Sequence, residues 1–267
     1  MSAAANKKRR QFIQQMTGLG VLGLAAAGGI FGASYLKAEP LRLRPPGAVP
    51  EEEFIGLCIK CGQCLQVCPY DAIRLEDIDG KVGVGMAYIE PRDRGCYLCD
   101  AFPCILACPS GALDHEHDSI EFVHMGIAVV KNPGACLAKT GTPVPDEAID
   151  RIYDHTTVLS AAERSSHHVE ISDSDPEKAK LQKQLLLKLE KYRKENPCTI
   201  CADLCPYPEP LKAIGMVKAK GGGLLPEIRE ACVGCGACVE LCPTDVIEII
   251  PRKTYADIYG EKGEHHA

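Results

Sequence analysis

Cysteine is the residue of this 267-residue chain whose spacing points most directly to chemistry. Of the 16 cysteines, 15 lie in four strings that each end in Cys-Pro. The strings are Cys58-x2-Cys61-x2-Cys64-x3-Cys68, Cys96-x2-Cys99-x4-Cys104-x3-Cys108, Cys198-x2-Cys201-x3-Cys205 and Cys232-x2-Cys235-x2-Cys238-x3-Cys242. The first and last have the spacing with which thiolates hold [4Fe–4S] clusters. Together with Cys136, the strings supply the four thiolates per cluster that four clusters require, so we predict a four-cluster electron carrier.

Other uses of cysteine fit this spacing less well. Disulfide scaffolds are typical of short secreted chains, and disulfide chemistry does not call for four repeats ending in Cys-Pro. Structural zinc prefers two separated Cys-x2-Cys pairs, whereas three cysteines follow one another at two-residue intervals here. Covalent c-type haem is excluded because the chain has no Cys-x-x-Cys-His sequence.

The composition argues against nucleic acid as a partner. The net charge is −6, and removing residues 1–38, whose five charged residues are all basic, takes it to −11. An acidic chain lacks the basic surface that phosphates need. Aromatic residues are only 5% of the chain, which suits small folds stabilised by metal binding.

The N-terminus has the pattern of an export signal. Arg9 and Arg10 precede Phe12 and an uncharged stretch rich in Gly and Ala at 15–36. Twin arginines in this context are typical of a signal that exports folded proteins, so clusters can be inserted before export. We therefore predict a periplasmic protein that is exported folded by the twin-arginine route and works at the periplasmic face of the inner membrane.

The signal also has features of a membrane anchor. Residues 16–36 are uncharged and long enough to span a bilayer, and the candidate cleavage sites are poor. We favour retention or inefficient cleavage. Residues 1–38 are accordingly interpreted as a signal or anchor, and 39–52 as an extended, Pro-rich linker.

Beyond the linker the chain repeats itself. Each Cys-Pro leads into a short apolar run, and apolar or Gly-containing segments return toward the next string, as at 82–89, 126–131 and 214–220. A loop, short helix and two strands, when doubled, give a βαββαβ unit. We predict an α+β fold of two ferredoxin-like modules that carry the clusters, built from 53–136 and 198–252, and followed by a C-terminal tail at 253–267.

The stretch 137–197 interrupts this regularity as an insertion. Ser174, Pro176 and Glu177 predict a helix start with Pro at the first helical position and a capping box. Leucines at intervals of four predict one apolar helix face, and Pro197 ends the helix, which we place near 176–194. This face either packs on its own domain or docks a partner.

Several stretches resemble the NapG/MauM-type ferredoxins, which are periplasmic four-cluster proteins. They are Leu41-Arg-Leu-Arg-Pro-Pro-Gly-Ala48, the first string with Tyr70-Asp71, Pro103-Cys104 with Cys108-Pro-Ser-Gly-Ala-Leu-Asp114, Met125-Gly-Ile-Ala-Val129, and Ala231-Cys232-Val-Gly-Cys235-Gly-Ala-Cys238. The resemblance covers roughly 8–136 and 198–252. It implies a non-catalytic carrier that takes electrons from a NapH-type membrane quinol-oxidising protein to a periplasmic cytochrome or terminal reductase. Membrane association would come through this partner or the uncleaved N-terminus.

Two other functions remain open. The chain could be a tightly bound iron–sulfur subunit of a molybdenum oxidoreductase complex, although such a subunit needs no signal of its own. It could instead be an assembly factor that matures a reductase, but such proteins work in the cytoplasm and the signal argues against this.

The third string departs from the family pattern. Relatives have Cys-Leu a few residues before the corresponding string, whereas 61 residues separate Cys136 from Cys198. We expect Cys136 to be the fourth ligand; the alternatives are Glu195, which stands where a regular string has its first cysteine, and a three-iron cluster.

The fourth cysteine of one string binds the cluster of another in two-cluster ferredoxins, so the strings must pair. Pairing could be sequential or nested. We favour nested pairing, because the two irregular inner strings together resemble the iron–sulfur subunits of molybdenum reductases.

Overall fold

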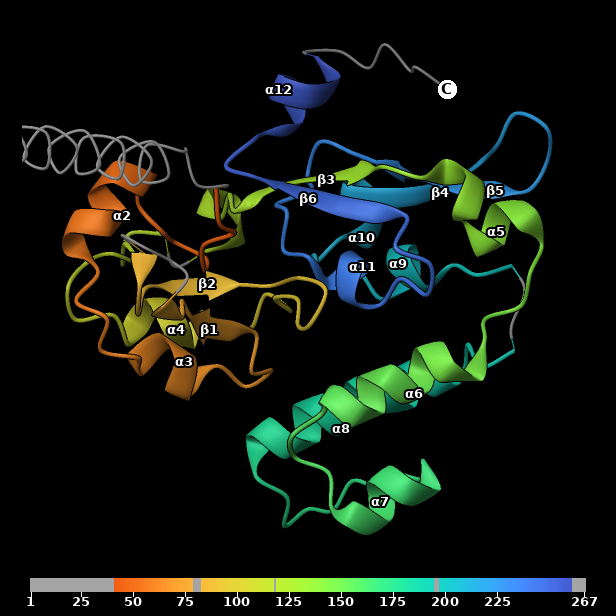
Figure 1. The fold of residues 1–267 in the computed structure, drawn as a ribbon, viewed down its shortest axis with the longest axis horizontal. Coiled ribbons are helices and arrows are strands. Elements are labelled where there is room, and N and C mark those ends of the chain that lie inside the picture. Colours follow the sequence, from red (N-terminus) through yellow and green to blue (C-terminus); the bar gives the residue numbers. More distant parts are fainter. Residues whose placement is uncertain (1–40, 79–82, 118, 195–196, 261–267) are drawn as a thin grey trace, which may run out of the picture. The chain divides into compact units, whose positions relative to one another are not determined.

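The computed structural model describes residues 41–78, 83–117, 119–194 and 197–260 (Figure 1). The predicted export signal and Glu195 therefore lie outside the described residues. The chain divides after Leu41, and the cysteine strings all belong to the compact unit Arg42–Ala267. Within the described residues, no helix is both long and apolar enough to cross a membrane.

The first two cysteine strings belong to one region of this unit, which we call the first module. Its elements are α2 (Glu51–Leu57), α3 (Gln63–Val67), β1 (Ile73–Leu75), β2 (Ala87–Ile89) and α4 (Pro103–Leu106). β1 and β2 pair antiparallel with Ile73 opposite Ile89. Isolated bridges join Leu43 to Ile89 and Ala48 to Leu113. The segment after the last cysteine of the second string thus returns to the start of the module.

The segment interpreted as a linker is part of this module. Leu43 is 3% exposed and Arg44 is 5% exposed. The Arg44 guanidinium donates to Ala87 O (2.9 Å) and to Glu51 Oε1 (2.6 Å), and α2 already begins at Glu51. The described part of the segment expected to be an extended linker over 39–52 therefore packs on this module, and its last two residues belong to α2.

The last two strings form the second module together with the strand that follows the second string. Its elements are η2 (Ile120–Phe122), β3 (Gly126–Val130), η3 (Pro133–Ala135), α9 (Ile200–Asp203), α10 (Pro210–Ala213), β4 (Ile214–Lys218), β5 (Leu224–Ile228), α11 (Ala237–Glu240) and β6 (Ile247–Pro251). β4 and β5 form an antiparallel hairpin. β3 pairs antiparallel with β6, with Ala128 opposite Ile249, which closes the module across a long stretch of chain (Figure 1).

The short cluster-string helices are bounded by glycine and by Cys-Pro. Gly62 precedes α3 with φ +73° and Gly236 precedes α11 with φ +85°, a backbone conformation that suits glycine. Cys68 and Cys242 follow at the other end, each before a proline that cannot continue a helix. The loop–helix–strand repeat expected from the sequence is present at these two strings.

The insertion is helical over most of its length. It contains α5 (Leu137–Thr140), α6 (Asp146–His155), α7 (Ala161–Ser166) and α8 (Glu177–Glu190), and α6 lies alongside α8 (Figure 1). Leu185, Leu186 and Leu189 on α8 are buried, as are Ile149 and Ile152 on α6. The predicted apolar face therefore exists, and it packs within this chain.

The predicted start of α8 needs a correction. Pro176 is the N-cap residue and not the first helical residue, and no side chain caps the helix. The Ser174 hydroxyl is 2.8 Å from the Ser172 hydroxyl, so the capping box with Glu177 does not form. Capping boxes stand elsewhere, at Ser160 of α7 and at Thr254 of α12 (Tyr255–Tyr259), a helix inside the predicted tail.

Candidate metal-cluster sites

Four cavities of nearly equal size bring the cysteines together in fours. The space in each cavity, including the part that is open to solvent, is roughly 350–370 Å³. We number them by position: site 1 is lined by Cys58, Cys61, Cys64 and Cys108; site 2 by Cys68, Cys96, Cys99 and Cys104; site 3 by Cys205, Cys232, Cys235 and Cys238; site 4 by Cys136, Cys198, Cys201 and Cys242. All sixteen cysteines are used once. Four cavities of one size with one donor set indicate one kind of occupant.

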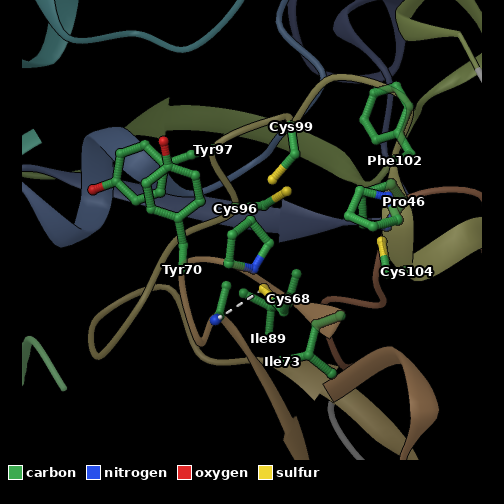
Figure 2. Close-up of a pocket in the computed structure, with 13 residues that line it drawn as sticks. Pro46, Cys68, Tyr70, Ile73, Ile89, Cys96, Tyr97, Cys99, Phe102 and Cys104 are labelled. Carbon is green, nitrogen blue, oxygen red and sulfur yellow. Dashed lines mark hydrogen bonds between the residues drawn. The ribbon is translucent and has the colours of Figure 1, made fainter. Parts of the chain in front are cut away.

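Site 2 illustrates the arrangement (Figure 2). Cys96 and Cys99 point into the cavity from one side, and Cys68 and Cys104 line it from other elements. The remaining lining is apolar or aromatic and includes Ile73, Ile89, Phe102 and Pro46. The rings of Tyr70 and Tyr97 lie 4.5 Å apart between their centroids at one edge. The cavity is thus a dry, sulfur-lined chamber.

The strings pair sequentially, and the expected nested pairing is wrong. In the first module Cys108 of the second string completes the site of the first string, and Cys68 of the first completes that of the second. Cys205 and Cys242 exchange in the same way in the second module. The reason is packing: α3 lies against α4, and α9 lies against α11. The irregular spacing of the inner strings does not decide which helices pack together.

Cys136 reaches site 4 despite its distance along the chain from Cys198. It lies between η3 and α5, where β3 has carried the chain into the second module, and it is buried. The Lys194 N–H donates to Val144 O (3.2 Å), so the insertion leaves and returns at nearly the same place. The insertion therefore loops out between two parts of one site.

Backbone N–H groups are directed at the last cysteine of three strings. Ala72 N donates to Cys68 Sγ, Leu113 N to Cys108 Sγ and Val246 N to Cys242 Sγ, each at 3.4 Å. The turn after Cys-Pro aims these donors, with Asp71 and Asp245 both at positive φ. Hydrogen bonds to sulfur stabilise the thiolate and set the potential of an iron–sulfur cluster.

Holding these cysteines as thiolates requires a cationic occupant. Burial raises the pKa of Cys64 and Cys198 to about 11 and that of Cys99 and Cys104 to about 12, and repulsion between neighbouring cysteines adds to the rise. Among the described residues, Lys60 at site 1 is the only basic one in the four linings. Four thiolates in such a chamber need positive charge from elsewhere, which the iron of a [4Fe–4S] cluster supplies. In the described part of the chain, no group of three His, Cys, Asp or Glu side chains is placed so that it could bind a single metal ion.

A buried ionic network between the modules has no motif in the sequence. Glu240 on α11 is 0% exposed and Arg94, before the second string, is 3% exposed; Arg94 Nη1 is 3.0 Å from Glu240 Oε1. Arg94 Nη2 also donates to His155 O (3.0 Å) in the insertion. The sequence gives one signal of this network, the acidic residue Glu240 within the fourth string. From sequence alone, such a residue is expected to face solvent on a helix.

The insertion also holds both modules directly. Gln182 Nε2 donates to Pro69 O (2.7 Å) in the first module, and Arg151 Nη2 donates to Glu240 O (2.6 Å) in the second. Lys178 and Asp71 form an ion pair at 2.5 Å. These contacts place the insertion against the cluster-binding loops of both modules.

Comparison with known proteins agrees with this geometry. A family described as "4Fe-4S dicluster domain" matches residues 57–112, which hold both strings of the first module, and one described as "4Fe-4S binding domain" matches 226–248. The third string falls outside both matches. No solved structure matches the chain.

Curated relatives cover nearly the whole chain. The ferredoxin-type protein NapG of Escherichia coli K12 is 30% identical over 99% of this chain and 94% of its own length. The methylamine utilization ferredoxin-type protein MauM of Methylobacillus flagellatus is 27% identical over 97% and 90%, and that of Paracoccus denitrificans is 39% identical over 45% and 55%. With its [4Fe–4S] domains and a ferredoxin-type relative aligned almost end to end, the chain belongs to the NapG/MauM family of iron–sulfur electron-transfer proteins.

Proposed function

We propose that the protein binds four [4Fe–4S] clusters through all sixteen cysteines and serves as a periplasmic electron carrier. The observation that carries the proposal is the set of four similar cavities, each lined by four cysteines. In every cavity two strings contribute cysteines, and in site 4 Cys136 is added to them. Two ferredoxin-like modules, one for each pair of sites, are the fold that we propose to hold them.

The residues of the chain bind the clusters and tune them. Each bound cluster supplies a reversible one-electron acceptor. The thiolates hold it, the apolar walls exclude water, and the N–H groups of Ala72, Leu113 and Val246 stabilise sulfur charge at sites 2, 1 and 4. These are the factors by which a protein sets cluster potential.

The family relationship supports a proposal for the direction of electron flow. We propose a NapH-type membrane protein that oxidises quinol as the donor, and a periplasmic cytochrome or terminal reductase as the acceptor. Site 1 suits contact with a partner, because Cys61 is its exposed ligand and Ile59 at its rim is 63% exposed.

Iron and acid-labile sulfide analysis of the anaerobically purified protein tests the cluster number. Four [4Fe–4S] clusters correspond to about 16 iron and about 16 sulfide per chain. Stoichiometric zinc with little iron would contradict the proposal. A pull-down from solubilised membranes tests the partner, and recovery of a quinol-oxidising membrane protein is the expected result.

A further inference from the structure

The two modules touch through the backbones of their inner cluster sites. Gly95 and Cys96 of the second string lie against Cys235, Gly236 and Ala237 of the fourth. Cys96 N donates to Cys235 O at 2.9 Å, and Cys96 pairs with Gly236 in a parallel bridge. Cys96 lines site 2 and Cys235 lines site 3, so one hydrogen bond joins the ligand loops of two different modules.

Glycine is required for this approach. A Cβ on Gly95 would lie 2.5 Å from Ala237 N and 2.6 Å from Ala237 Cα, which are backbone atoms that cannot rotate away. A Cβ on Gly236, whose φ is +85°, would lie 2.8 Å from Pro91 Cβ. Leu98, two residues after Cys96, also forms part of the wall of site 3. The modules therefore interlock at their cluster loops.

Glu240 holds the contact from behind. Its Oε2 accepts from Gly95 N (2.7 Å) and from the Tyr97 hydroxyl (3.1 Å), and its Oε1 accepts from Arg94. Arg94, Gly95 and Tyr97, which lie at or just before the start of the second string, thus all donate hydrogen bonds to one carboxylate in the fourth string. A buried ion pair contributes little net stability, because desolvation offsets the attraction. Its distinctive effect here is geometric, since it sets the position of one ligand loop against the other.

We infer that the Cys96–Cys235 backbone contact is the junction across which an electron passes between the modules, with Gly95 and Glu240 as positioning residues. The inference rests on the proposed four-cluster function. It gives the sites one linear order, site 1, site 2, site 3, site 4. At the junction one electron leaves the reduced cluster of site 2 or 3 and reduces the oxidised cluster of the other, and no bond forms or breaks. In the competing arrangement, each module is an independent two-cluster carrier, and the contact between the modules only stabilises the fold.

The first test measures magnetic coupling in the reduced full-length protein. The outer clusters are removed with Cys58→Ala and Cys61→Ala at site 1 and Cys136→Ala and Cys198→Ala at site 4. The two inner clusters should still broaden each other's EPR signal, and the added Gly95→Ala change should weaken this broadening. Gly56→Ala is the matched control, because a Cβ there meets nothing within 4 Å. Two inner clusters with signals of isolated centres would overturn the junction.

The same comparison can be made when all four clusters are present. Gly95→Ala should slow the redistribution of electrons between modules after partial reduction, whereas Gly56→Ala should leave it unchanged. Equal rates of electron redistribution in the two variants would overturn the inference. This test does not need the variant that lacks the outer clusters, so it holds even if that variant fails to assemble. Iron analysis separates failure of the proposed function from failure of the junction. Fewer than four clusters per chain would contradict the proposed function, whereas four clusters without coupling between the modules would contradict only the junction.

The second test uses the charge of Glu240. Glu240→Gln keeps the side-chain size but removes a negative charge beside two cluster loops and leaves Arg94 unbalanced. Both changes favour the more negative, reduced cluster, so the midpoint potentials of the inner pair should rise while the outer pair stays unchanged. Glu248→Gln is the control, because Glu248 is 46% exposed and pairs with Lys131, which follows β3. Unchanged inner potentials in a folded, fully loaded variant would show that Glu240 has no role at the junction.

Discussion

Cys136 is a buried cysteine that lines site 4 beside Cys198, Cys201 and Cys242. Its own loop supplies no second cysteine, so it depends on the surrounding packing to meet the others. Its Sγ is 3.9 Å from Leu224 O on the β4–β5 hairpin, which shows that the hairpin covers it. Site 4 takes its ligands from three separate segments, whereas sites 1, 2 and 3 each take theirs from two, so we expect site 4 to be the most sensitive to one substitution.

Changing Cys136 to Ser should therefore damage one cluster selectively. A serine hydroxyl is a harder and weaker ligand than a thiolate, so site 4 should lose iron or convert to a three-iron form. Iron analysis with EPR spectroscopy of each cluster measures the effect.

Glu195→Gln serves as the control, because a carboxylate ligand would predict the reverse result. Loss of iron in that variant with an intact Cys136→Ser protein would assign the ligand to Glu195. If neither variant changes, the site uses another ligand.

At the scale of elements, α6 and α8 form a brace, which we define as the pair of helices that contacts both modules. Their apolar faces are buried against each other and the chain, while their polar side chains bond both modules through Gln182 and Arg151. Lys183 of α8 is 7% exposed and pairs with Glu163 at 2.9 Å and Asp175 at 3.0 Å. These ion pairs hold α7, and the loop between α7 and α8, against the brace. We therefore expect the insertion to stabilise the cluster-binding modules.

Two adjacent leucines of α8 test this role. Leu186 is 1% exposed and Leu187 is 40% exposed. Leu186→Ala should destabilise the protein by about 2–5 kcal/mol through lost burial and the cavity left behind. Leu187→Ala should change stability by at most about 0.5 kcal/mol. Thermal unfolding of both loaded variants under anaerobic conditions measures the difference, and equal midpoints would contradict the packing.

Deleting residues 141–193 and joining the ends with a short Gly/Ser linker tests the brace as a whole. The deletion spares Cys136 and Cys198 but removes Gln182, Arg151 and the carbonyl of His155 that accepts from Arg94. We expect a lower unfolding midpoint and faster loss of iron on dilution. A deletion protein with wild-type stability that fails only to deliver electrons to its acceptor would favour docking.

At the scale of the whole molecule, the proposed periplasmic location would require the clusters to be assembled before export. The sixteen thiols are spread over both modules, and site 4 needs Cys136, which follows β3, and Cys242, which precedes β6, from opposite sides of the insertion. A chain exported unfolded would meet an oxidising compartment with all these thiols free. The twin-arginine route is therefore the expected one, although the signal residues lie outside the described structure.

Changing Arg9 and Arg10 together to Lys should leave the loaded protein in the cytoplasm, because the twin-arginine machinery recognises the arginine pair and a general secretory signal only needs positive charge. Cell fractionation with iron analysis of each fraction measures the outcome. Normal delivery of the double variant to the periplasm would exclude this route.

The sequence predicted that the cysteines gather in groups, and the four cavities show this grouping, because a short loop of fixed spacing brings several cysteines together without help from the rest of the fold. The same locality made the short helices, the strands after Cys-Pro and the approximate position of α8 predictable. The pairing of strings was not predictable, since it depends on α3 packing against α4 and α9 against α11. The contact of Gly95 with Ala237 and the burial of Glu240 likewise arise only when distant segments meet, because no local pattern distinguishes them from an ordinary loop glycine and a surface acid.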